Sequence, residues 1–214
     1  MKSYIDELDR NIFNFVEYEG YDDRYPSLSM QAFSSDFYDE IRHASRRLFQ
    51  IFCKAAKVFQ MAPDDFARNM DMPDNLIPYL HKSNALGLPT WLSRFDFVLD
   101  VNGNLRMVEL NADTPCFIIE SYYANEVAAN YVGRKHPNIE CRKELHTFFK
   151  RMYDAVLSAK YGRNQYKSML ANRERLPKDP FVFSCFHDYF EDYGTTQFLM
   201  KELKTACPEA DTRF

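Results

Sequence analysis

The sequence predicts an α/β fold of the α+β kind, in which a helical N-terminal region packs on a mixed sheet with a central β-hairpin. Apolar residues recur at helical spacing over residues 37–60 and 138–172, and strand-like runs flank an Asn-Gly pair at residues 102–103. A strand pattern, a helix pattern and the beginning of another strand follow residue 176. We therefore expect one part over residues 1–175 and the start of a smaller α/β subdomain, truncated in appearance, over residues 176–214.

Composition excludes several classes of protein. The chain has 214 residues, of which 46% are hydrophobic and 16% aromatic, so it can bury a substantial core. Its net charge of −4 and its scattered basic residues argue against nucleic-acid binding. No apolar run approaches the length of a membrane span, and the N-terminus does not resemble a secretory signal. Five cysteines without a CxxC pair suit reduced thiols. We expect a cytoplasmic protein that binds neither membrane nor nucleic acid.

The first 90 residues are predicted to be mainly helical. Residues 1–33 are irregular and are expected to cover the main body. Ser34, Ser35 and Asp36 offer an N-cap for a long amphipathic helix over residues 37–60. Shorter helices are expected near residues 64–70 and 75–81, before Gly87 and Pro89 break the pattern.

The hairpin is the most informative stretch of the chain. Strands are expected at residues 92–100 and 105–111, joined by a two-residue type I′ turn on Asn102-Gly103. This turn places Asp96 opposite Glu109 and Arg94 opposite Asn111, with all four side chains on one face. Two carboxylates facing each other across a strand pair repel, so a cation is expected between them.

Helices are expected to cover the sheet after the hairpin. Residues 116–132 look helical, with an end near Gly133, and a longer helix is expected over residues 138–172. Residues 181–186 have the pattern of a short buried strand, and a helix with acidic residues in its first turn follows. The last residues would begin another strand.

The charged hairpin residues suit magnesium chemistry. Asp96, Glu109 and Asn111 offer only oxygen ligands, which favour Mg²⁺ or Mn²⁺ over zinc. Protein-bound Mg²⁺ commonly carries nucleotide phosphates, and Arg94 could stabilise charge on a transferred phosphoryl group. The chain has no GxxxxGK[ST] or GxGxxG motif, so much of any ATP site would lie elsewhere. The alternative is an exposed hairpin end in which Arg94 pairs with both acids without a metal.

These residues carry a resemblance to a known family. The pattern RxD, hairpin, ExN, with 13 positions from Asp96 to Glu109, resembles the metal-binding strand pair of ATP-grasp ligases. The longer run RFDFVLDVNGNLRMVELNADTPCFIIES is similar to the glutathionylspermidine synthase family, and the similarity continues through FEDYGTTQFLMKEL. The resemblance covers roughly residues 25 to 214. It implies an ATP-grasp-like fold, with the subdomain after residue 176 of the pre-ATP-grasp type.

The resemblance also implies roles for individual residues. Asp96, Glu109 and Asn111 would hold Mg²⁺, and Arg94 would be the catalytic residue that stabilises phosphoryl or acylphosphate oxygens. The implied substrate-binding residues are Thr114 and Cys116, toward a thiol peptide, and Glu191, Asp192 and Thr195, of which the two acids suit the ammonium groups of a polyamine. Cys116 stands where the family usually has serine. For Glu191 and Asp192, a charge pair favoured by the helix dipole is an equally good interpretation.

The expected function is therefore part of an ATP- and Mg²⁺-dependent carboxylate-amine ligase that acts through an acylphosphate. Its substrates would be a thiol peptide or another carboxylate, and a polyamine or another amine. The family's ATP-clasping lysines lie in a second half that this chain does not contain. One alternative is a truncated, non-catalytic module that binds a peptide or polyamine. A metal-dependent phosphate hydrolase ranks last, because no nucleophile or water-orienting base is evident.

Overall fold

The computed structural model separates the chain into two compact units. One unit, here the hairpin unit, is Gln31–Pro115; the other, here the helical unit, combines Met1–Met30 with Cys116–Phe214. The α+β class is confirmed, since helices accompany two small sheets. The structure describes residues 3–17, 25–27, 29–85, 90, 92–112, 116–136, 138–172, 180–186 and 188–214.

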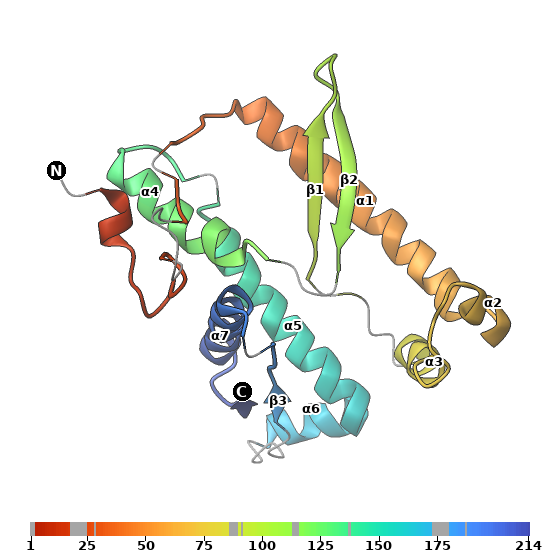
Figure 1. The fold of residues 1–214 in the computed structure, drawn as a ribbon. Coiled ribbons are helices and arrows are strands. Elements are labelled where there is room, and N and C mark those ends of the chain that lie inside the picture. Colours follow the sequence, from red (N-terminus) through yellow and green to blue (C-terminus); the bar gives the residue numbers. More distant parts are fainter. Residues whose placement is uncertain are drawn as a thin grey trace. The chain divides into compact units, whose positions relative to one another are not determined.

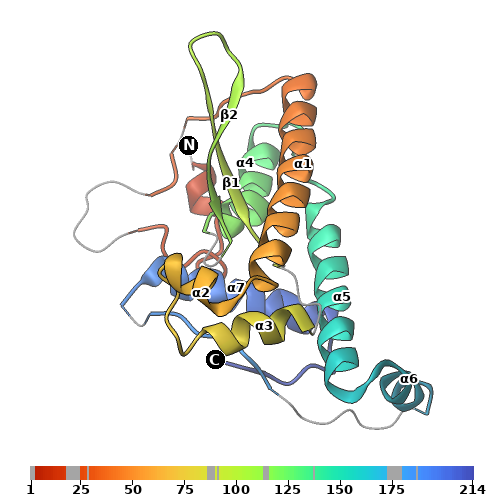
Figure 2. The same cartoon turned by 90° about the vertical axis from the view of Figure 1, so that its right-hand side faces the viewer.

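Three helices precede the hairpin, close to their predicted positions (Figure 1). They are α1 (Ser35–Gln60), α2 (Asp64–Asn69) and α3 (Ile77–Ala85). The predicted N-cap is confirmed, because Ser34 Oγ accepts a hydrogen bond from the Phe37 backbone N–H at 3.1 Å. Helix α3 crosses near the C-terminal end of α1 (Figure 2).

The hairpin forms as predicted, but its turn does not. Strand β1 (Arg94–Leu99) pairs antiparallel with β2 (Leu105–Asn111). The predicted type I′ turn is wrong: Asp100 and Asn104 close a loop of three residues, and only Gly103 in it has a positive φ, of 78°. The Asp100 carboxylate accepts hydrogen bonds from the backbone N–H groups of Asn102 and Asn104, which favours this longer loop.

A β-bulge restores the predicted register at the charged end. Near the loop the pairs are Leu99 with Leu105 and Phe97 with Met107, one residue away from the expected register. Val108 is the extra residue of the bulge, so the next pair is Asp96 with Glu109. The two deviations cancel, and the charged pairs lie where the sequence predicts them.

The helical unit contains one more helix break than expected. A π-helical turn, η2 (Glu120–Ala124), leads into α4 (Asn125–Tyr131), and α7 (Phe190–Ala206) lies near the end of the chain. The single helix predicted over residues 138–172 is wrong. It is divided into α5 (Cys141–Tyr161) and α6 (Arg163–Ala171), because Gly162 adopts φ 80° and ends α5.

The strand after residue 180 is shorter than predicted. Strand β3 (Phe181–Val182) pairs in parallel with β4 (Thr212–Arg213), which makes a β-α-β unit with α7. Val182 is 70% exposed and Phe186 76% exposed, so the expectation of a buried strand is wrong. In the described residues β1-β2 and β3-β4 form separate sheets. A single mixed sheet with a central hairpin, and a division near residue 175, stay predictions.

The larger core belongs to the helical unit. The irregular N-terminal segment, with a short 3₁₀ helix η1 (Tyr4–Glu7), contributes six of its described side chains to this core, and α5 packs against α7. These six side chains are Tyr4, Ile5, Leu8, Phe13, Phe15 and Val16. In α1, all of which the structure describes, no side chain is buried.

Candidate functional site

The predicted metal-binding residues lie together at the end of the hairpin distal to its loop. Arg94 pairs with Asn111 and Asp96 with Glu109 in the strand register. Arg94 donates two hydrogen bonds to Asp96, from Nε to Oδ1 at 2.7 Å and from Nη2 to Oδ2 at 3.0 Å. These hydrogen bonds, with the guanidinium charge, lower the pKa of the Asp96 carboxyl. Asp96 is therefore a stable anion at neutral pH.

The charged face of the hairpin points away from α1. The Phe95 ring lies 6.0 Å from the Phe52 ring of α1, between centroids, and Leu110 faces the same side. Because side chains alternate along a strand, Arg94, Asp96, Glu109 and Asn111 project from the opposite face. On the α1 side a cavity of about 470 Å³ opens between α1, α3 and the end of β2. Its described lining comprises Phe49, Phe52, Cys53, Ala56, Lys57, Gln60, Ser83, Asn84, Thr90, Leu110 and Ala112.

The residues on the charged face have the donor atoms that magnesium prefers. Asp96 and Glu109 each bring a carboxylate and Asn111 an amide oxygen, all from adjacent strands. Among the described residues, no three His, Cys, Asp or Glu side chains group to hold a metal. A site here would thus have two carboxylates and one amide, as the sequence predicts, with the remaining ligands from water or substrate. The roles of these three residues stay predictions.

The predicted substrate-binding residues belong to the helical unit, apart from Thr114, which falls outside the described residues. The Cys116 Sγ lies 3.9 Å from Asp192 Oδ1, so residues 76 positions apart meet. Glu191 and Asp192 occupy the first turn of α7, as expected. Thr195 follows on the same helix face, and its side chain is only 7% exposed.

Glu120 is a residue of this region that the sequence reasoning missed. Its Oε1 accepts a hydrogen bond from Tyr25 Oη at 2.9 Å, whereas its buried Oε2 has no partner in the described structure. Burial, and then the nearby charge of Glu191, raise the pKa of Glu120 above its ordinary value, against the hydrogen bond from Tyr25. A lone charge within the apolar helical run FIIESYY was the available signal.

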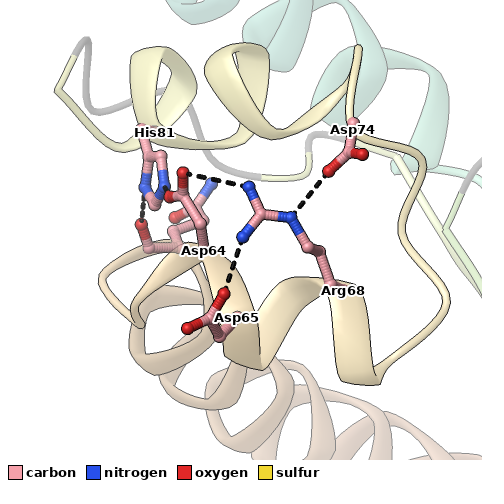
Figure 3. Close-up of polar contacts among 6 residues, drawn as sticks. Asp64, Asp65, Arg68, Asp74 and His81 are labelled. Atoms are coloured by element: carbon pink, nitrogen blue, oxygen red, sulfur yellow. Dashed lines mark hydrogen bonds and ion pairs between the residues drawn. The ribbon is translucent and has the colours of Figure 1, made fainter.

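Two further polar clusters were also unpredicted. Glu202, 1% exposed, accepts hydrogen bonds from Arg142 at 2.7 and 3.2 Å and contacts His146 Nε2 at 2.6 Å. In the hairpin unit, His81 joins α3 to the corner between α1 and α2, as Figure 3 shows. Both clusters connect helices, and neither contains a residue from the predicted sites.

Comparison with known protein families identifies a family for this chain. The family model described as "Glutathionylspermidine synthase preATP-grasp" matches residues 4–212, which is nearly the whole chain. No curated protein and no solved structure matches the chain. Among the described residues, no helix has the length and apolar character needed to cross a membrane.

Proposed function

Because the chain belongs to the glutathionylspermidine synthase family, we propose that it supplies the metal-binding and substrate-binding side of an ATP-dependent carboxylate-amine ligase. The observation that carries the proposal is the pairing of Asp96 with Glu109 and of Arg94 with Asn111 on one face of the hairpin. In this proposal Asp96, Glu109 and Asn111 hold Mg²⁺. The bound ion would neutralise charge on the phosphate oxygens of ATP.

The proposed reaction has two steps. A substrate carboxylate attacks the γ-phosphorus of ATP, which forms an acylphosphate and releases ADP. The amine nitrogen then attacks the acyl carbon, the C–N bond forms, phosphate leaves and the amine loses a proton. In this proposal Arg94 donates hydrogen bonds to the phosphoryl oxygens as their charge grows. The carboxylate substrate is a thiol peptide or a similar acid, and the amine is a polyamine or a similar base.

The residues near the start of α7 support the amine half of this proposal. Glu191 and Asp192 lie in its first turn, and Asp192 contacts Cys116. Carboxylates suit the ammonium groups of a polyamine. Cys116 and Thr114 are proposed to contact the carboxylate substrate, where a thiol at position 116 would be a weaker hydrogen-bond partner than a hydroxyl.

The experiment is ADP release by the complete protein, with Mg²⁺, a thiol peptide and a polyamine. Asp96→Ala, Glu109→Ala and Asn111→Ala should each abolish metal-dependent turnover, and Arg94→Ala should lower it by on the order of 10²- to 10³-fold. Asp39→Ala is a matched control, because Asp39 is an exposed carboxylate of α1 and lies outside the hairpin strands. Unchanged rates in the three metal-site variants would contradict the assignment. Ligand binding without ADP release would instead favour the non-catalytic binding module.

A further inference from the structure

The cavity on the α1 side of the hairpin has the size of a small-molecule site. Its volume of about 470 Å³ falls in the range of ligand pockets, roughly 300 to 1,000 Å³. Its described lining belongs entirely to the hairpin unit, and it lies on the opposite face of the hairpin from Asp96 and Glu109. The cavity is therefore separate from the site described above, and no step of the proposed ligase reaction uses it.

One face of α1 forms the apolar wall of the cavity. Phe49, Phe52, Cys53 and Ala56 recur at intervals of three and four residues, so their side chains lie on one side of the helix. Leu110 of β2 continues this wall on the hairpin. Aromatic rings pair favourably with one another in offset or edge-to-face arrangements. A wall that contains two phenylalanine rings therefore suits a ligand with an aromatic body.

Hydrogen bonds between α1 and α3 fix the polar end of the cavity. Gln60 Nε2 donates to Ser83 Oγ at 2.7 Å, and Ser83 Oγ donates to the Leu80 carbonyl oxygen at 2.8 Å. Asn84 follows in the lining, and its side-chain amide has no hydrogen bond with another described residue. This amide offers one donor group and one acceptor to a ligand. The polar end is thus held in place by the protein and still has bonding capacity.

The charge of the cavity favours an anion. Lys57 is the one charged residue of the described lining, and its ammonium group forms no ion pair with the described part of the chain. Helix α1 has no acidic residue after Glu40. The cations that follow Glu40 in α1 are Arg42, Arg46, Arg47, Lys54 and Lys57. Their combined field attracts negative charge. The helix dipole favours a lysine near this end of α1, but it does not account for the position of Lys57 at a cavity.

We propose that this cavity binds a small carboxylic acid with an aromatic body. The ring system packs against Phe49 and Phe52, and the carboxylate pairs with Lys57. Asn84 supplies a further donor and acceptor at the polar end. The assignment goes beyond the proposed ligase function and does not depend on it.

The test is isothermal titration calorimetry of the chain with naphthalene-2-carboxylate at low ionic strength. The wild-type chain should bind this acid, and should bind the neutral naphthalene-2-carboxamide about tenfold more weakly. Lys57→Met keeps the length of the side chain and removes its charge, so it should weaken binding of the acid by about tenfold and leave binding of the amide unchanged. Lys54→Met is the matched control. It removes the same charge from an exposed position of α1 outside the described lining, and should bind the acid like the wild-type chain.

A second pair of variants tests the location of the bound acid. Ala56→Trp places a large side chain in the wall of the cavity and should abolish binding. Ala55→Trp adds the same side chain at the neighbouring position, which lies outside the described lining, and should leave binding intact. Both alanines are exposed, so both variants should keep the fold, which circular dichroism checks.

Three outcomes would overturn the inference. They are absence of naphthalene-2-carboxylate binding to the wild-type chain, equal affinity of Ala56→Trp and Ala55→Trp, and full affinity in Lys57→Met. If Ala56→Trp fails to fold, Lys57→Met and Lys54→Met still decide. ADP release by the complete protein measures the ligase separately, so failure of either proposal leaves the other in place.

Discussion

Arg94 and Asp96 lie two residues apart on β1 and are joined by two hydrogen bonds, of 2.7 and 3.0 Å. The Arg94 guanidinium group therefore binds the same carboxylate that is proposed to bind Mg²⁺. The interpretation without a metal requires Arg94 to pair with both acids, and the structure shows its pair with Asp96. A metal ion at Asp96 must share the carboxylate with Arg94 or displace it.

This competition predicts opposite effects of Arg94→Ala on metal binding and on turnover. Without nucleotide, the variant should bind Mn²⁺ about two- to fivefold more tightly, because an ion pair that is partly open to solvent contributes about 1 kcal/mol or less. Electron paramagnetic resonance of free Mn²⁺ measures the affinity, and Arg106→Ala, near the hairpin loop, is the control. Weaker Mn²⁺ binding by Arg94→Ala would contradict competition for Asp96.

His81 predicts a pH dependence in the packing of α3 (Figure 3). Its Nδ1 lies 2.9 Å from the Gln60 carbonyl oxygen and its Nε2 2.9 Å from Asp64 Oδ1, so both nitrogens face acceptors. Only the protonated ring can donate to both. The hydrogen bonds to Asp64 and then to Gln60 raise the pKa of His81, against partial desolvation. Arg68 also faces Asp64, at 3.8 Å, and bonds Asp65 and Asp74.

The sign follows from the raised pKa. The contribution of the His81 hydrogen bonds to the stability of the fold is fully present below the unfolded-state pKa of His81. It is lost as the pH rises through the higher folded-state pKa. Amide hydrogen exchange in α3 should accelerate over this range, after correction for the intrinsic pH dependence of exchange. In Asp64→Asn the His81 pKa, measured by NMR, should fall. An unchanged His81 pKa in that variant would show that Asp64 is not the main cause.

The sequence pattern predicted the pairs of charged residues correctly, but it did not predict the loop and the bulge that lie between them in the hairpin. Alternation and a glycine turn were sufficient to expect a hairpin near residues 92–111. The carboxylate of Asp100, which closes the longer loop, and the bulge at Val108 depend on contacts that spacing does not reveal. The Asp96 and Glu109 pair is correct because these two deviations compensate.

Contacts between distant residues were the main limit on predicting the site. The bond from Tyr25 to Glu120 spans 95 positions, and the contact of Arg142 with Glu202 spans 60. No periodicity links such residues, because tertiary packing alone brings them together. Gly162 illustrates the same limit within one helix: a single glycine in a helical pattern is tolerated in many helices, but here it ends α5.

Removal of one hydrogen-bond partner of the buried Glu202 carboxylate should strongly lower the stability of the fold. Burial alone would raise the pKa of this carboxyl, but the hydrogen bonds from Arg142 and His146 outweigh burial and lower it. Arg142→Ala should reduce the free energy of unfolding by about 2 kcal/mol, because a buried carboxylate loses a charged donor. Urea denaturation measures the change, and Lys143→Ala, from the exposed pair with Glu140, should cost less than about 1 kcal/mol.

The same cluster predicts sensitivity to acid. Because the folded-state pKa of Glu202 is lowered, its stabilising contribution is present above the unfolded-state pKa and is lost as the pH falls through the folded-state pKa. Glu202→Gln should therefore lessen the loss of stability on acidification. An equally steep loss in Glu202→Gln and the wild-type chain would assign acid sensitivity to other carboxylates.

The close packing around Gly194 in α7 predicts that a side chain at this position destabilises the fold. A Cβ at this position would lie 2.9 Å from ring atoms of Phe15, and would also overlap the Asn14 side chain. Phe15 is fully buried, so it cannot move aside without disturbing the core. Gly194→Ala should lower the free energy of unfolding by about 1–3 kcal/mol, although alanine favours helix more than glycine does. Adding Asn14→Ala to the Gly194→Ala variant should restore only the part of the lost stability that comes from the clash with the Asn14 side chain. If Gly194→Ala were as stable as the wild type, α7 would not be packed directly against residues 14 and 15, and the support for Glu191 and Asp192 would lie elsewhere.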